Sequence, residues 1–221
     1  MSSIQIIVNL VGTAALQTLI MVFASTVFSL ILGFPLGILL CTADPLTGIS
    51  PKPVLHQALT RIVNVLRSFP FIILMILLFP LSRVLIGTSI GTSAAILPLS
   101  IAAAPFVARI IETALKEVDT GVVQAARSMG STNMQIIIKV LLPEALPSLV
   151  SGITLTIINL IGYSAMAGAI GGGGLGDLAI RYGYQRFRTD IMIASVIIIL
   201  LLVEIIQFTG SKISSALQKS R

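Results

Sequence analysis

The stretch ALPSLVSGITLTIINLIGYSAMAGAIGGGGLG, residues 145–176, decides the fold class because it contains no aspartate, glutamate, lysine or arginine. A helix needs about 20 apolar residues to cross the hydrocarbon core of a bilayer, and this stretch is long enough. Residues 84–108 and all residues before Asp44 also lack these charged types. In the whole chain, 56% of residues are hydrophobic and only 10% are charged, whereas a soluble domain has about 25% charged residues. The sequence therefore predicts an all-α integral membrane protein.

Five membrane-spanning helices, in one transmembrane domain that covers residues 1–221, are predicted from the apolar runs. They are expected near residues 14–41, 62–82, 84–108, 146–169 and 191–208. The second run is the least regular because Arg61 and Arg67 lie at its start, where long side chains reach the membrane interface. No basic residues precede the first run, and it exceeds the about 7–15 apolar residues of a signal peptide, so we expect a retained helix.

The distribution of basic residues predicts the orientation, because cytoplasmic loops are enriched in lysine and arginine. With residues 42–61, residues 109–144 and the C-terminal tail inside, most of the 14 basic residues are cytoplasmic. These are Lys52, Arg61, Arg67, Arg109, Lys116, Arg127, Lys139, Lys212, Lys219 and Arg221. An odd number of spans then places the N-terminus outside and the C-terminus in the cytoplasm. The net charge of +6 reflects these loops, and no nucleic-acid partner is expected.

The long cytoplasmic loop, residues 109–147, has the signals of ordered helices rather than of a tether. Glu112 and Lys116 have the i, i+4 spacing that supports a continuation of the third span as a helix. Asp119 or Thr120 is predicted to cap the next helix by accepting a backbone hydrogen bond. The loop is therefore expected to present a separate short helix on the cytoplasmic surface.

This short helix is predicted over residues 121–129 and ends at Gly130, a favourable residue just beyond a helix C-terminus. Thr132 and Gln135 have the spacing of a capping box that opens the following helix. A helix that rests on the bilayer usually has a basic face and large apolar anchors. This one has a single Arg127 and mostly small side chains. Docking of another protein is therefore the preferred interpretation.

The loop resembles the EAA loop of ABC importer permeases through Gln124-Ala125-Ala126, Gly130 and Val140-Leu141-Leu142-Pro143. The family pattern is Glu-Ala-Ala, three residues, Gly, nine residues and Ile-x-Leu-Pro, and the spacing here matches throughout. Gln124 replaces the glutamate and Val140 replaces the isoleucine, so a salt bridge made by the family's glutamate is not carried over. The resemblance implies that the short helix is a coupling helix, which fits a cleft on an ATP-binding subunit. The residues that it assigns to coupling are Gly121, Val122, Val123, Gln124, Ala125, Ala126, Arg127, Met129, Gly130, Leu142 and Pro143.

Nearly the full length is similar to the methionine permease subunits of bacterial ABC importers. The strongest segments are residues 67–74, 87–91, 103–109 and 162–168. This resemblance implies the type I ABC importer permease fold with five spans, a homodimer in the bacterial inner membrane, and import of L- and D-methionine through an alternating-access path. It also implies two partner ATPase subunits that bind ATP and Mg, and an external methionine-binding lipoprotein. No cofactor, metal or catalytic site is expected in this chain.

Small residues in the fourth span suggest a weaker set of site residues. Ser164 and Met166 are candidates for lining the translocation path, although small residues more often serve close helix packing. The glycine-rich residues 171–176 are not followed by the Lys-Ser or Lys-Thr of a phosphate-binding loop. They are expected to form a flexible turn or a close contact with the binding protein. The charged residues that follow are either a docking rim or a solvated loop.

Three other functions compete with a methionine permease. An ABC permease for a quaternary-amine osmoprotectant would favour an aromatic cage, but the chain has no Trp and only 3 Tyr. An ion-coupled carrier would use an intramembrane ionisable residue such as Glu204, which alternatively faces the interface near Lys212. The EAA-like loop argues against such a carrier. A membrane-embedded enzyme has no catalytic constellation, and His56 is expected to be a surface residue without metal ligands nearby.

Overall fold

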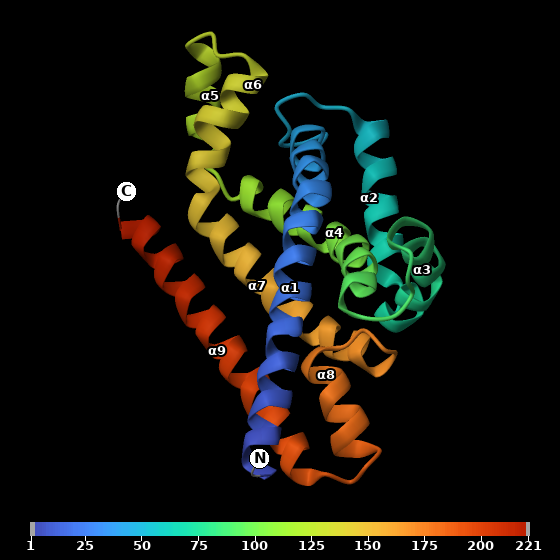
Figure 1. Cartoon of the computed structure of the whole chain (residues 1–221). Helices are drawn as coiled ribbons and strands as arrows, with labels where there is room; N and C mark the ends of the chain where they lie inside the picture. Colours follow the sequence, from blue (N-terminus) through green and yellow to red (C-terminus); the bar gives the residue numbers. More distant parts are fainter. Residues whose placement is uncertain (1–2, 220–221) are drawn as a thin grey trace.

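The computed structural model describes residues 3–219, and these residues form helices without any strand (Figure 1). The elements are α1 (Ser3–Thr42), α2 (Pro53–Ser68), α3 (Phe71–Ile86), α4 (Thr92–Lys116), α5 (Thr120–Ser128), α6 (Asn133–Ile136), the π-helical η1 (Ile137–Leu141), α7 (Leu142–Ala169), α8 (Gly174–Leu178), the π-helical η2 (Ala179–Tyr184) and α9 (Thr189–Lys219). Figure 1 shows α5 and α6 at one end of the molecule and the start of α1 near α8 and η2 at the other.

Among the described residues, 4 helical segments are long and apolar enough to cross a membrane. They are Asn9–Thr42, Thr92–Lys116, Asn133–Ala169 and Thr189–Lys219. The expected span over residues 62–82 is not one continuous helix, because α2 and α3 meet there at a bend of 100°. The physical reason is Pro70, whose ring disfavours a helical conformation at Phe69 and whose nitrogen has no hydrogen to donate. Phe69 is extended, with ψ of 131°. Counting this bent pair as one span gives up to 5.

Helices α1 and α4 pack closely because two glycines on α1 face the backbone of α4. A Cβ atom on Gly33 would lie 2.6 Å from the carbonyl oxygen of Ala104. One turn later, a Cβ atom on Gly37 would lie 2.7 Å from the carbonyl oxygen of Ala108. Such close approach of backbones through small residues is a main source of helix association in membranes, because burying apolar side chains between helices adds little stability when the surrounding lipid is equally apolar.

The glycine-rich residues 171–176 pack inside the molecule, which corrects the expectation of a flexible turn. The N–H group of Gly174 donates to Oε1 of Gln17 on α1 at 3.0 Å. Gly176 is buried, and a Cβ atom on it would overlap the backbone of Ala165 on α7. The glycines are therefore needed for contact with this chain's own helices.

Candidate functional site

Helix α5 is a short, separately capped element at the end of the molecule that carries the EAA-like loop (Figure 1). Oδ1 of Asp119 accepts a hydrogen bond from the N–H group of Gly121 at 2.6 Å, which caps the start of the helix as predicted. At its end, Gly130 has φ of +81°. The N–H group of Gly130 donates to Arg127, and that of Ser131 donates to the carbonyl oxygen of Ala126. These paired bonds form a Schellman motif and confirm the predicted stop at Gly130.

The capping box that opens α6 is also confirmed. Oγ1 of Thr132 accepts from the N–H group of Gln135 at 3.3 Å, and Oε1 of Gln135 accepts from the N–H group of Thr132 at 2.8 Å. The chain then continues without a break through η1 into α7. Pro143 lies in the first turn of α7, directly after the π-helical η1. Proline has no backbone N–H group to donate, and this position tolerates that loss.

The residues of α5 divide between an inner and an outer face. Val123 and Ala126 pack against the cluster of buried side chains at this end of α1, α4 and α7, and Leu142 contacts the same cluster. The other predicted coupling residues are exposed: Gly121, Val122, Gln124, Ala125, Arg127, Met129, Gly130 and Pro143. Met129 is 86% exposed. An apolar side chain that protrudes this far, beside small residues on a helix fixed from behind, forms a surface that another protein can cover.

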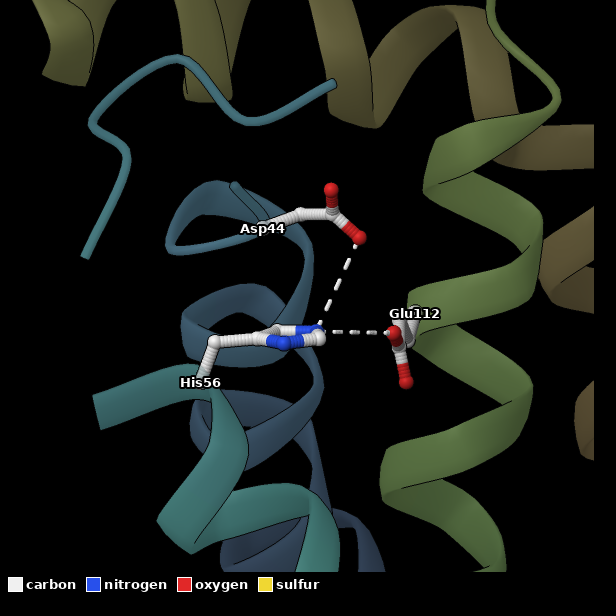
Figure 2. A group of neighbouring side chains, drawn as sticks. All are labelled: Asp44, His56 and Glu112. Carbon is white, nitrogen blue, oxygen red and sulfur yellow. Dashed lines mark ion pairs between the residues drawn. The ribbon is translucent and has the colours of Figure 1, made fainter. Parts of the chain in front are cut away.

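A charged cluster built on the buried carboxylates of Asp44 and Glu112 lies next to this surface, and the sequence did not predict it. Figure 2 shows the ring of His56 pointing toward both Asp44 and Glu112, with its Nε2 atom 3.6 Å from Oδ2 of Asp44 and 3.8 Å from Oε1 of Glu112. The Nζ atom of Lys116 lies 2.6 Å from the same Asp44 oxygen and 2.8 Å from the same Glu112 oxygen. His56 is therefore not an isolated surface residue, as was expected, because folding brings it against two carboxylates.

The cluster is extended and neutralised by Arg109. Its Nη1 atom lies 2.6 Å from Oε2 of Glu112, and its Nη2 atom donates to Oδ1 of Asn64 on α2 at 2.9 Å. Glu112 is only 2% exposed, and a buried carboxylate requires such partners. The predicted Glu112–Lys116 pair is thus confirmed, but it belongs to a larger network that joins α2, α4 and the loop after α1.

The pKa of the Asp44 carboxyl is held well below its usual range. Burial disfavours the charged form, but hydrogen bonds from the Lys116 ammonium and from the N–H groups of Thr47 and Leu46 outweigh that effect. Asp44 is therefore ionised whenever the protein is near neutral pH.

Asp44→Asn is expected to lower the free energy of unfolding at pH 7 by about 2 kcal/mol, because Lys116 loses a charged hydrogen-bond partner. The folded pKa lies below the unfolded one, so the carboxylate's contribution is complete above about pH 4 and is lost as the pH falls through the folded pKa. Denaturant unfolding in detergent at pH 7 and pH 3 should therefore show a smaller difference at pH 3. The exposed Asp177–Arg181 pair offers a control, since Asp177→Asn should cost less than about 1 kcal/mol. Equal effects of Asp44→Asn at the two pH values would contradict the assignment.

The weaker site residues are placed differently by the structure. Ser164 is buried, and its hydroxyl donates to the carbonyl oxygen of Ile161 at 2.7 Å, so it lines no exposed surface of this protomer. Met166 is 49% exposed on α7. Glu204 is exposed on α9, and no ion pair to it is found among the described residues. Lys212 lies over the Phe208 ring, with Nζ 4.3 Å from the ring centroid.

The charged residues after the glycine-rich turn pair largely with their near neighbours. Arg181 lies 2.8 Å from Asp177, and Arg188 lies 2.6 Å from Asp190. Arg186 lies over the ring of Tyr182, 4.6 Å from its centroid. These contacts order the rim locally and leave both earlier interpretations of it open.

The fold and the exposed capped helix define a membrane permease component of a transport system. A family model described as "Binding-protein-dependent transport system inner membrane component" matches residues 33–210, and the chain belongs to this family. It is 51% identical over 202 residues to the probable D-methionine transport system permease protein MetI of Vibrio cholerae, covering 91% of this chain and 89% of that one. It is 49% identical over 164 residues to the methionine import system permease protein MetP of Bacillus subtilis, covering 74% of each. A solved structure of the MetNI methionine ABC transporter in inward-facing conformations matches with a TM-score of 0.92 and 45% identity, over 98% of this chain and 99% of that one.

The predicted type I ABC permease fold is thereby confirmed, and the chain is a multi-pass inner-membrane permease subunit. Local sequence signals identified α5 and its caps, but they did not distinguish the inward-facing Val123 and Ala126 from the exposed residues of the helix. They missed the cluster around Asp44 and His56. The available signals were weak: Asp44 is the first charged residue of the chain, and the Glu112–Lys116 spacing marked one half of the network.

Proposed function

We propose that this chain is the permease subunit of an ATP-driven importer for methionine, with L- and D-methionine as substrates. The observation that carries the proposal is helix α5, which is fixed from behind by buried side chains and exposed in front at the positions of the EAA-like motif. Methionine as the substrate is supported by the relatives, whose names specify D-methionine or methionine transport.

The proposed assembly is a homodimer of this chain with two ABC ATPase subunits and an external methionine-binding lipoprotein. ATP and Mg would bind to the ATPase subunits, and this chain would contribute the path and the docking helix rather than catalysis. The N-terminus would lie outside and the C-terminus in the cytoplasm, in accord with the basic residues. In Figure 1 the start of α1 lies opposite to α5, the helix expected to face the cytoplasm.

Uptake of labelled methionine into proteoliposomes tests the function directly. The vesicles would contain this chain, its cognate ATPase and its binding protein, with ATP present or absent on the ATPase side. Uptake is expected only with ATP and only with the complete set, because the driving force would enter through α5. Competition by unlabelled L- and D-methionine would define the stereochemical preference.

The same vesicles separate the competing functions. ATP hydrolysis without methionine uptake would retain the ABC permease and discard the cargo, and a labelled quaternary amine would then be tried. Uptake by this chain alone, independent of ATP, would favour an ion-coupled carrier. Glu204→Gln would be the next variant in that case.

A further inference from the structure

The loop between α1 and α2, defined here as the 43–50 loop, contacts both the exposed helix α5 and the end of α4. Nη2 of Arg127 on α5 donates to the carbonyl oxygen of Ile49 at 2.5 Å. Oδ2 of Asp44 accepts from the ammonium group of Lys116 on α4 at 2.6 Å. We propose that this loop is a second mechanical link, which transmits movement of α5 to α1 and α2, with Lys116 as its positioning residue. The inference rests on the proposed function, because it assumes that a partner ATPase moves α5.

The 43–50 loop is built to move as one body. Oδ1 of Asp44 accepts from the N–H groups of Leu46 and Thr47 at 2.8 and 3.0 Å, which closes the turn from inside. The N–H group of Ser50 donates to the carbonyl oxygen of Thr42 at 3.0 Å, which ties the far side of the loop to the end of α1. A displacement at Ile49 would therefore reach α1 instead of being absorbed by a flexible segment.

A single hydrogen bond is well placed to carry that displacement. A cavity of about 300 Å³ lies between the loop and α5, and its lining includes Gly48, Val123 and Gln124. The bond from Arg127 to Ile49 bridges the two sides of this cavity. Because the donor is a charged guanidinium, this hydrogen bond is stronger than one between neutral groups and opposes separation of α5 from the loop.

The charged cluster at the other end of the loop joins it to two more helices (Figure 2). Lys116 reaches Asp44 and Glu112 together, and His56 on α2 faces the same two carboxylate oxygens. Asp44, His56 and Glu112 have a composition suited to a metal ion. However, the Lys116 ammonium already lies within hydrogen-bond distance of both oxygens, and Lys116 and Arg109 together balance the charges of the two carboxylates. The cluster is therefore better suited to hold α2, α4 and the loop in register than to bind a cation.

A continuous set of contacts leads from this cluster into the membrane region. Helix α2 passes into α3 at the 100° bend. At the start of α3, the ring of Phe71 stacks on that of Tyr163 on α7, with centroids 4.4 Å apart and planes 6° apart. Movement of α2 would thus reach the segment of α7 that carries Met166. Coupling is defined by the response of each element to a change at α5, and the test measures that response.

The decisive variant removes the ion pair between Asp44 and Lys116 without leaving a buried charge unpaired. Asp44→Asn combined with Lys116→Met removes one charge of each sign, and Glu112 keeps its partner Arg109. Lys52→Met is the matched control, because it removes an exposed lysine just beyond the loop.

Uptake of methionine and hydrolysis of ATP would be measured in the same proteoliposomes of the complete complex. The double variant is expected to lower the ratio of uptake to hydrolysis by about 10-fold, while the control keeps the parental ratio. Lys116→Arg should retain most of that ratio, because it keeps the charge between the carboxylates.

Hydrogen–deuterium exchange of the same complexes gives a readout that does not depend on the cargo. Between the nucleotide-free state and the state trapped with ADP and vanadate, the parent should show changed exchange in α5, in the 43–50 loop and in α2. In the double variant, α5 should still respond, but the response of α2 should be lost. An unchanged response of α2 and an unchanged uptake ratio in the folded double variant would overturn the proposal. ATP hydrolysis without methionine uptake in the parent would discard the cargo, and the exchange data would still decide whether the loop transmits movement.

Discussion

Replacing Gly130 by valine is expected to reduce ATP-driven methionine uptake by about 10-fold, because the strain of a β-branched residue in the left-handed region costs about 1–2 kcal/mol. Gly130 has φ of +81° and closes α5 through the paired hydrogen bonds of its end. Apart from Gly130 and its chain neighbours, no atom of the described residues lies within 4 Å of the position that a Cβ would take, so the penalty is conformational rather than steric. The valine variant would relieve its strain by unwinding the end of α5, and the exposed Met129 would be displaced.

Gly130→Asn is the matched control, since asparagine tolerates the left-handed conformation far better than valine does. For both variants, methionine uptake and co-purification of the ATPase would be measured. The two measurements separate a requirement for the backbone conformation from a requirement for space at the docked surface. Retained function in the asparagine variant would identify the backbone conformation as the requirement. Loss in both would indicate that the docked partner leaves no space for any side chain at Gly130. Parental uptake by the valine variant would contradict the role assigned to α5.

Replacing Gly37 by leucine is expected to prevent most of the expressed molecules from folding correctly. A Cβ atom at this position would lie 2.7 Å from the carbonyl oxygen of Ala108 and 2.7 Å from the Cβ atom of Ile111. Overpacking that side chains can relieve costs about 1–3 kcal/mol. Here the obstacle includes backbone, so α1 must separate from α4, and we expect a cost above about 3 kcal/mol, a large part of a typical stability of about 5–15 kcal/mol. Fluorescence-detected size-exclusion chromatography and denaturant unfolding would measure the loss.

Gly12→Leu is the control for that substitution, because Gly12 lies on the same helix with nothing within 4 Å of its Cβ position. Both variants add the same apolar side chain to α1 and improve its helix propensity equally. A folded, monodisperse Gly37→Leu protein with parental stability would contradict the packing of α1 against α4.

The features that the sequence predicted correctly arise from local interactions. The caps of α5 and α6 depend on residues within a few positions, Asp119 and Gly130 for one and Thr132 and Gln135 for the other. Such hydrogen bonds form between neighbours in sequence, so their residue types are readable without a fold. Membrane-spanning helices are predicted equally directly from long uncharged runs, because crossing a bilayer requires only sufficient length and apolarity.

The bend between α2 and α3 was only partly predictable from the sequence. Pro70 lies within the apolar run, and membrane helices tolerate proline with bends of very different size. Its presence predicts a disturbance, but the angle depends on what the following helix packs against. In the folded structure the start of α3 packs on α7 through the stacked rings of Phe71 and Tyr163, a contact that the sequence does not reveal.

The sequence by itself determined that this protein has helices able to cross a membrane and where the short helix α5 begins and ends, whereas the structure decided that Val123 and Ala126 of that helix face inward. Only the tertiary structure decided that Asp44, His56, Glu112 and Lys116 meet, and that the glycine-rich turn packs against α1 and α7. The physical reason is distance along the chain. Periodicity and capping act between near neighbours, whereas a buried ion network and a glycine contact are defined by helices that are far apart in sequence and become adjacent only when the chain is folded.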